Sequence, residues 1–206
     1  MIATRKELAF YLKADRMMNR GKWSPDITDR LKGLFFPDHI MHFLSAMRHV
    51  DYYSRSRVGV NRVLYYGWLW KFHRLSVKLG FSIGPSVFGY GLVIYHYGTI
   101  VVGDNNRIGN YAVMHTSTCI AGKESIVGDG LFMSTGAVIA NRVELGDNVT
   151  VGANSVVCKS IRQSNILLTG APAAIKKDSP VWYVQEGGIF LDRARQVESL
   201  KASLTL

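Results

Sequence analysis

The chain has 206 residues, 48% of them hydrophobic, which suits one sizeable core or one core with a small satellite domain. Lys and Arg outnumber Asp and Glu by 25 to 15, which gives a net charge of +10. No window reaches the run of about 20 apolar residues that a membrane-spanning helix needs, and the charged N-terminus is unlike a secretory signal. We therefore expect a cytoplasmic protein without a transmembrane segment.

The first segment, residues 1–82, is expected to be helical and is strongly basic. It holds 15 Lys and Arg against 6 Asp and Glu, few glycines, and apolar residues at helical spacing between Leu64 and Leu79. Pro25 and Pro37 are expected to separate short helices, because proline disfavours the helical conformation in the residue before it. The basic excess is compatible with an anionic membrane surface, an acidic polymer or plain solvent. No nucleic-acid motif is visible, so no nucleic-acid partner is expected.

A six-residue repeat begins after Phe81, where glycine becomes frequent. Its bulky apolar positions are Phe88, Ile94, Ile100, Ile108, Met114, Ile120, Val127, Met133, Ile139, Leu145, Val151 and Val157. Two irregular steps, from Ile100 to Ile108 and from Ile120 to Val127, predict small insertions at corners. A period of six fits neither a helix nor a strand-and-turn meander. We expect a mainly β fold, a left-handed parallel β-helix over residues 83–177 in which three repeats make one triangular coil.

The period also predicts which residues stack on one side of this prism. Ile94, Met114, Met133 and Val151 are three repeats apart and are expected to lie above one another. The residues that follow them form a first column of Tyr95, His115, Ser134 and Gly152. The next residues form a second column of His96, Thr116, Thr135 and Ala153. Two histidines thus fall on adjacent coils beside small residues, where an extended thioester arm could lie close to the backbone.

Three segments resemble the hexapeptide-repeat acyltransferases, and within them the serine acetyltransferase-like branch. They are FGYGLVIYHYGTIVVGDNNRIGNYAVMHTSTCIAG, the later VGDGLFMSTGAVIANRVELGDNVTVGANSVV, and GAPAAI at 170–175. The resemblance covers about residues 83–177. It implies acetyl-CoA as co-substrate, a small hydroxyl acceptor, no metal, and a homotrimer with sites between subunits.

The resemblance places His96 at the position of the family's general base. A neutral imidazole titrates near the working pH, and it can take the proton of a hydroxyl whose oxygen attacks the thioester carbonyl. His115 could orient the acceptor, donate to the oxyanion, or merely occupy a corner.

For the coenzyme, the resemblance suggests that backbone groups near Gly122 line the thioester. Ser134 and Ala153 would line the track of the pantetheine arm, and Lys176 or Lys177 would meet a phosphate. Lysine suits a phosphate as a mobile point charge, although a solvated turn is an equally good explanation of this pair.

Two departures from serine acetyltransferase concern the acceptor. That enzyme carries an aspartate directly before its catalytic histidine, where this chain has Tyr95, and a longer loop with a second histidine, where this chain has KESIVGDG. Both losses remove groups linked to binding an amino acid, and a tyrosine face suits stacking on a pyranose ring. We therefore expect the acceptor to be a hydroxyl of a sugar or polysaccharide precursor, with Tyr95 binding it.

Two other functions stay open. Asp129 or Asp51 could reach the site from elsewhere and restore a serine pocket, which would make the chain a serine O-acetyltransferase of cysteine biosynthesis. A catalytically dead β-helix could instead serve as an interaction module through its basic helices.

The remaining candidate ligands lack metal-site spacing. The histidines of the helical segment, expected to be structural or on the surface, are His39, His42, His49 and His73. Cys119 and Cys158 are best explained as small buried hydrophobic residues. Residues 178–206 include IFLDRARQVESLKASL, which predicts a helical tail that packs on the prism or on a neighbour.

Overall fold

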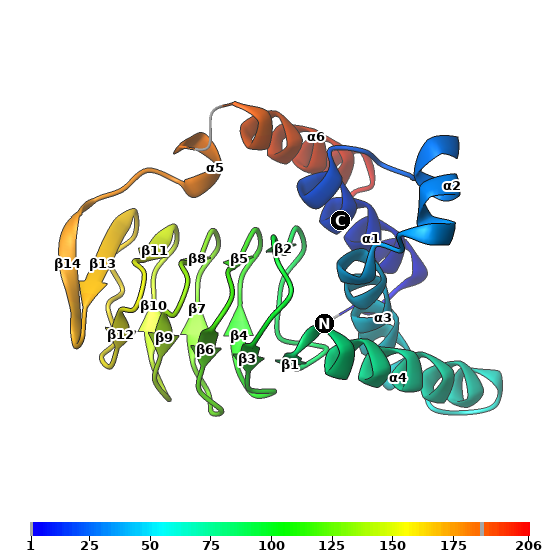
Figure 1. Cartoon of the computed structure of the whole chain (residues 1–206), viewed down its shortest axis with the longest axis horizontal. Coiled ribbons are helices and arrows are strands. Elements are labelled where there is room, and N and C mark those ends of the chain that lie inside the picture. The colour runs from blue at the N-terminus through cyan, green and yellow to red at the C-terminus, as the bar shows by residue number, and fades with distance from the viewer. Residues whose placement is uncertain (1, 186–187) are drawn as a thin grey trace.

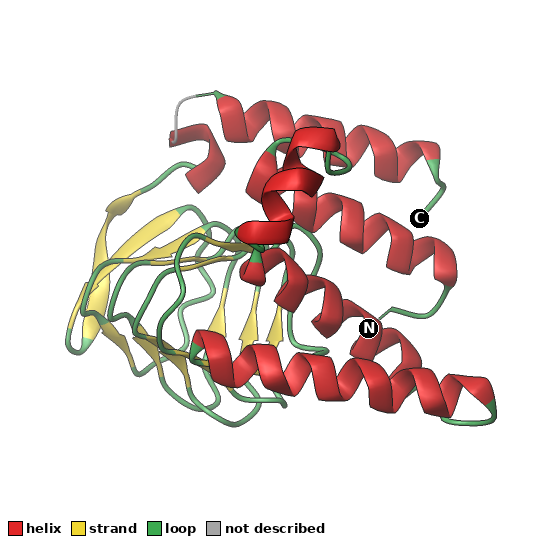
Figure 2. Cartoon of the chain, turned by 45° about the vertical axis from the view of Figure 1, so that its right-hand side comes forward, coloured by secondary structure: helices red, strands yellow, loops and turns green. Residues whose placement is uncertain are grey.

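The computed structural model describes residues 2–185 and 188–206. A group of helices occupies one end of the molecule and a β-solenoid extends from it, and the C-terminal segment returns from the far end of the solenoid to the helices (Figure 1). Figure 2 shows the helices packed side by side across the end of the solenoid. Within the described ranges, no helix is both long enough and apolar enough to cross a membrane.

The N-terminal segment is helical, as predicted. Its helices are α1 (Arg5–Arg20), α2 (Ile27–Phe35), α3 (His39–Ser54) and α4 (Val60–Leu79). The predicted boundaries at Pro25 and Pro37 are confirmed, because α2 begins after the N-cap Asp26 and α3 after the N-cap Asp38. In both caps the aspartate side chain accepts a hydrogen bond from a backbone N–H of the first turn.

The solenoid strands pair in parallel into three sheets that run along its length. Sheet A contains β1 (Phe81–Ile83), β3 (Ile100–Val102), β6 (Thr118–Ile120), β9 (Val138–Ile139) and β12 (Val156–Val157). Sheet B contains β4 (Arg107–Ile108), β7 (Ile126–Val127) and β10 (Glu144–Leu145). Sheet C contains β2 (Val93–Ile94), β5 (Val113–Met114), β8 (Phe132–Met133), β11 (Val149–Val151), β13 (Ile166–Gly170) and, antiparallel to β13, β14 (Ala173–Asp178).

The predicted stacking in sheet C is confirmed. Ile94 pairs with Met114, Met114 with Met133, and Met133 with Val151. Leu168 of β13 continues the same column. All five side chains are buried, so the apolar residues of the six-residue period point into the interior of the solenoid. The predicted parallel β-helix is confirmed.

The predicted insertion between Ile100 and Ile108 is wrong. Val102, not Ile100, pairs with Ile120 in sheet A, so Val102 holds the interior position that continues the column. The extra residues of this coil therefore lie earlier, in the corner 95–99. Ile100 and Val102 are both buried, because alternate residues of a strand point to the same face, and the sequence offered no means to choose between them.

The C-terminal tail folds back over the outer face of sheet C. It consists of α5 (Trp182–Gln185) and α6 (Ile189–Ser203), which confirms the predicted C-terminal helix. The side chain of Trp182 is buried, and its Nε1 donates a hydrogen bond of 2.8 Å to the carbonyl oxygen of Tyr111. The tail thus encloses a second apolar cluster, outside the solenoid, between sheet C, α1 and α6.

The two cysteines occupy different environments. Cys119 is half-buried, whereas Cys158 is exposed. The prediction of two buried thiols is therefore wrong for Cys158, which directly follows β12 where the chain turns outward at a corner.

A buried ion pair joins the helices to the first coil. Arg48 of α3 and Asp15 of α1 lie 2.8 Å apart, with side-chain exposures of 0% and 2%. Arg48 also donates to the carbonyl oxygens of Phe88 and Gly89, at 2.7 and 2.6 Å. The Arg48 N–H groups that face the solenoid therefore have hydrogen-bond partners, and a buried charge is costly without them.

Candidate active site

The corners that join sheet C to sheet A form a continuous edge, called here the site edge. Its segments are 95–99, 115–117, 134–136 and 152–154. Backbone N–H groups of Ser117, Gly136 and Asn154 donate to carbonyl oxygens of the coil before, at 2.6, 3.2 and 3.0 Å. The same three residues have positive φ, of 61°, 73° and 55°, a conformation that glycine and asparagine adopt at low cost.

The site edge is packed too tightly for larger side chains in places. A Cβ added to Gly136 would meet Oδ1 of Asn154 at 2.1 Å. Gly98, with φ 133°, lies against Thr116, whose Cγ2 would be 3.3 Å from an added Cβ. The neighbour of Thr116 in the first coil is therefore Gly98 rather than the predicted His96, because the two extra residues of that coil shift the register at the corner.

His96 lies in this longer corner. Both His96 and the following Tyr97 are exposed, and the Tyr97 side chain is 75% accessible to solvent. An exposed imidazole in this position can meet a hydroxyl brought to the edge.

Tyr95 and His115 lie on the outer face of sheet C, on adjacent strands, as the first predicted column requires. Their ring centroids are 5.1 Å apart. The ring of Phe190, from α6, meets Tyr95 edge-on at 6.2 Å, and Phe132 lies 5.2 Å from His115. Both residues are half-buried beneath the C-terminal tail, so each serves packing as well as any contact with an acceptor.

Helix α1 holds the backbone that leads into the site. The carboxylate of Asp15 accepts hydrogen bonds from the N–H groups of Gly91 and Leu92, at 2.8 and 3.1 Å. Asn19 donates to the carbonyl oxygen of Leu92 and accepts from the N–H of Ile94, at 2.7 and 3.2 Å. The residues directly before Tyr95 are thereby fixed on an otherwise open sheet edge.

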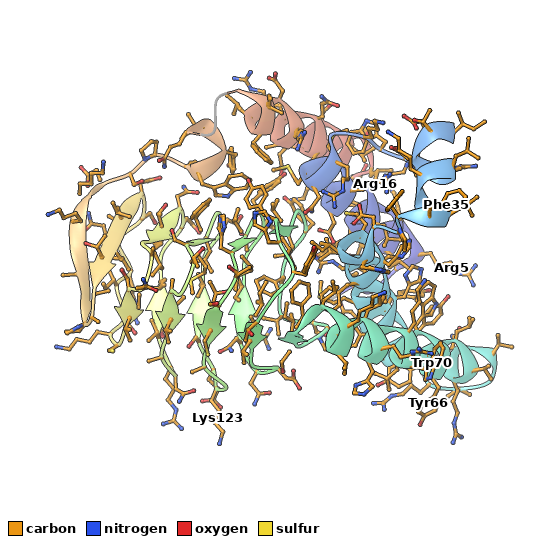
Figure 3. The ribbon with its side chains drawn as sticks, in the orientation of Figure 1. Arg5, Arg16, Phe35, Tyr66, Trp70 and Lys123 are labelled. Atoms are coloured by element: carbon orange, nitrogen blue, oxygen red, sulfur yellow. The ribbon has the colours of Figure 1, made fainter. Side chains whose placement is uncertain are left out.

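The predicted coenzyme residues divide between two edges of the prism. Ser134 and Ala153 lie on the site edge with His96. Gly122 is exposed in the corner 121–125, at the opposite end of sheet A, and the neighbouring Lys123 projects from this corner (Figure 3). A strand of three residues separates the two edges, about 10 Å of chain. A single chain therefore does not bring Gly122 to His96.

Lys176 and Lys177 are exposed on β14, the last strand of sheet C. Five strand spacings separate β2 from β14, or about 24 Å. The lysines thus mark the far end of the sheet that begins beside His96.

Neither proposed carboxylate completes a serine pocket within the chain. Asp51 is buried, where it accepts hydrogen bonds from the N–H of Ile2 and from the Ser86 hydroxyl. Asp129 lies at the corner between sheets B and C and accepts from the N–H of Asn110 at 2.7 Å. Both carboxylates are engaged away from the site edge.

Three of the other histidines, His39, His42 and His49, contact aromatic rings in the helical part, and His73 is exposed. His49 stacks on Trp68 with 3.8 Å between ring centroids, and burial lowers the pKa of its imidazole. The rings of His39 and His42 meet edge-on at 6.4 Å. Among residues 2–185 and 188–206, no group of three His, Cys, Asp or Glu side chains has the geometry of a metal site.

Sequence reasoning missed the supports of this site. The tail residues Trp182 and Phe190 cover the outer face of sheet C, and Asp15 and Asn19 bind its first strand. The tail's aromatic residues were a visible signal, since aromatic side chains seek apolar cover. No sequence signal pointed to the roles of Asp15 and Asn19, because these roles depend on how α1 packs against the first coil.

Comparisons with known proteins point to one group. No protein-family profile matches the chain. A serine acetyltransferase of Buchnera aphidicola is 28% identical over 111 residues, which are 50% of this chain and 40% of that protein. The chain therefore spans less than half the length of this curated relative.

Solved structures agree in fold. The Neisseria gonorrhoeae serine acetyltransferase has a TM-score of 0.64 and 24% identity, covering 85% of this chain and 69% of that one. A serine acetyltransferase in complex with CoA has a TM-score of 0.59 and 22% identity, covering 82% and 67%. The chain thus has the fold of the serine acetyltransferases, with an exposed histidine on the first coil of its solenoid.

Proposed function

We propose that this chain is an acyltransferase that moves the acetyl group of acetyl-CoA to the hydroxyl of a small acceptor. The observation that carries the proposal is the exposed His96 at the start of an edge of small residues. The shared fold and the similarity to a serine acetyltransferase support it, as does the solved neighbour in complex with CoA.

The chemistry follows from the position of the imidazole. Neutral His96 accepts the hydroxyl proton as the acceptor oxygen attacks the thioester carbonyl. The tetrahedral intermediate collapses by breaking the carbon–sulfur bond, and the imidazolium returns the proton to the departing sulfur. The products are an acetyl ester and free coenzyme A, and His96 is neutral again.

The coenzyme would lie along the solenoid. Ser134 and Ala153 offer little side-chain bulk along the site edge, which lets an extended arm approach the backbone. Lys176 and Lys177 carry positive charge at the far end of sheet C, suited to phosphate groups. Gly122 would act from a neighbouring subunit, since its edge faces away from His96 in one chain.

L-serine is the acceptor that the comparisons favour, and they give no support to the expected sugar. A sugar hydroxyl remains the second candidate for one reason. Tyr95 stands where serine acetyltransferases carry an aspartate, and Asp51 and Asp129 are engaged elsewhere, so neither of these two carboxylates is placed to pair with the serine ammonium.

The test is release of free thiol from acetyl-CoA, measured with L-serine, with a panel of neutral sugars, and without acceptor. Thiol release that depends on an acceptor supports the proposal, and the acceptor with the highest kcat/KM identifies the class. Release that no acceptor stimulates would make the solenoid a binding module instead.

A further inference from the structure

Helix α4 exposes an apolar face to solvent, in addition to the face that packs on the rest of the protein. Val63, Tyr66, Trp70 and Val77 are 73%, 53%, 62% and 71% exposed. Their spacing of three, four and seven residues places them along one side of the helix. The opposite side of α4 packs on α3 and on the solenoid. Tyr66 and Trp70 lie on α4 toward the helical end of the molecule (Figure 3).

Only cations accompany this apolar face. Residues 55–80 contain no Asp or Glu and carry the basic residues Arg55, Arg57, Arg62, Lys71, Arg74 and Lys78. The guanidinium of Arg74 lies 4.9 Å from the centroid of the Trp70 ring. Exposed apolar and aromatic side chains flanked by Lys and Arg are the composition of a helix that lies in a membrane interface.

A second copy of the chain fits this surface poorly. Two copies meeting through α4 would bring their cations together, and residues 55–80 of neither copy would supply a carboxylate to pair with them; like charges in contact disfavour association. An anionic lipid surface supplies both the apolar layer and the opposite charge.

Helix α2 provides a contrast. Its exposed apolar residues are Ile27, Leu31, Leu34, Phe35 and Phe36. Beside its own cations, Arg30 and Lys32, that helix carries a carboxylate, Asp29, which lies 3.7 Å from Arg16 and 3.3 Å from Lys22. The segment around α4 differs in that it contains cations and no carboxylate at all.

We propose that α4, with the preceding residues 55–59, docks on an anionic membrane surface and lies in its plane. The proposal does not depend on acetyl transfer. It does place the candidate site, because the carbonyl oxygen of Leu79 at the end of α4 accepts a hydrogen bond of 2.9 Å from the N–H of Gly98. A docked α4 would hold the corner that carries His96 close to the lipid headgroups.

The experiment is co-sedimentation of the full chain with vesicles of phosphatidylcholine alone or of phosphatidylcholine with phosphatidylglycerol. Wild type should bind the anionic vesicles more tightly, and salt should weaken that binding. Arg62→Glu/Arg74→Glu should weaken it roughly 25-fold or more, at about fivefold for each basic residue lost. Trp70→Ser should weaken it without changing net charge.

Arg142→Glu/Arg162→Glu is the matched control, because it changes net charge equally on later coils of the solenoid, where these side chains are 75% and 82% exposed. It should bind like wild type. No binding of wild type to anionic vesicles, or an equal loss in the control, would overturn the proposal. So would light scattering without lipid in which the α4 variants split an oligomer, since the surface would then join copies of the chain.

Discussion

His96 differs from Tyr95 and His115 in its exposure to solvent. Its side chain is exposed on a corner lengthened by two residues, whereas Tyr95 and His115 pack beneath Phe190 and beside Phe132. A general base must reach a substrate proton, so exposure at the site edge favours His96 for that role.

His96→Ala is expected to lower kcat/KM for acetyl transfer by roughly two to four orders of magnitude, the span for loss of a general base. The thermal midpoint should hardly change, because the side chain is exposed. Steady-state kinetics and a thermal scan check both. His73→Ala, which removes another exposed histidine, should leave kcat/KM unchanged, and near-normal turnover of His96→Ala would show that another group is the base.

His115→Ala should act differently, since this ring is half-buried between Tyr95 and Phe132. We expect a smaller loss of kcat/KM, or a change in KM for the acceptor, together with a lower thermal midpoint. A loss as large as that of His96→Ala with an unchanged midpoint would make His115 the base instead.

At the scale of elements, a buried ion pair is one of the contacts that join the helices to the solenoid. Arg48→Met leaves Asp15 as a buried carboxylate without its cation, although it still accepts from Gly91 and Leu92. The free energy of unfolding should fall by about 3–5 kcal/mol. Urea denaturation measures it, and Arg142→Met, which removes an exposed pair with Glu124, should cost no more than about 1 kcal/mol. Equal effects would show that the buried pair contributes no more than a surface one.

The contact of α6 with sheet C, in which Glu198 accepts hydrogen bonds from Tyr90 and Tyr111, should contribute less to folding stability at alkaline pH. Burial, and then the hydrogen bond to the Glu198 carboxylate, raise the pKa of Tyr90 and Tyr111. Below about pH 10 these tyrosines are protonated in both the folded and the unfolded chain. Above it the unfolded chain loses the protons first, so folding stability falls as pH rises.

Tyr111→Phe should therefore be less stable than wild type near neutral pH, because it loses the hydrogen bond to Glu198, and should lose less stability as pH rises. Thermal midpoints measured from about pH 8 to pH 11 would converge. Tyr66→Phe, at an exposed position, should run parallel to wild type. Parallel curves for Tyr111→Phe would contradict the assigned pKa shift.

The elements also show what the sequence can and cannot predict. The six-residue period placed Ile94, Met114, Met133 and Val151 in one column because the side chains at these four positions fill the apolar interior of the solenoid. It misplaced the insertion near Ile100, because two residues of that strand point inward. The hydrogen-bond partners of Asp15 and Trp182 could not be predicted, because they lie on segments distant in the sequence and no local pattern shows how those segments pack together.

At the scale of the whole molecule, the division of predicted coenzyme residues between two edges argues for assembly. His96 and Gly122 lie at opposite ends of sheet A, and a cyclic arrangement of prisms would bring unlike edges of neighbours together. We expect a homotrimer in light scattering. Mixing an inactive His96→Ala chain with an inactive variant of the Gly122 edge, such as Gly122→Trp, should restore part of the activity if sites are shared. A fully active monomer would contradict this.

The most direct measurement of the central claim follows the acetyl group itself. The protein is incubated with acetyl-CoA that carries an isotopic label in the acetyl group, with L-serine or a neutral sugar, and the acceptor is analysed by mass spectrometry. The account predicts the label on an acceptor oxygen, with one free coenzyme A formed per ester and almost none of either with His96→Ala. Acceptors that stay unlabelled, or labelling that persists in His96→Ala, would contradict it.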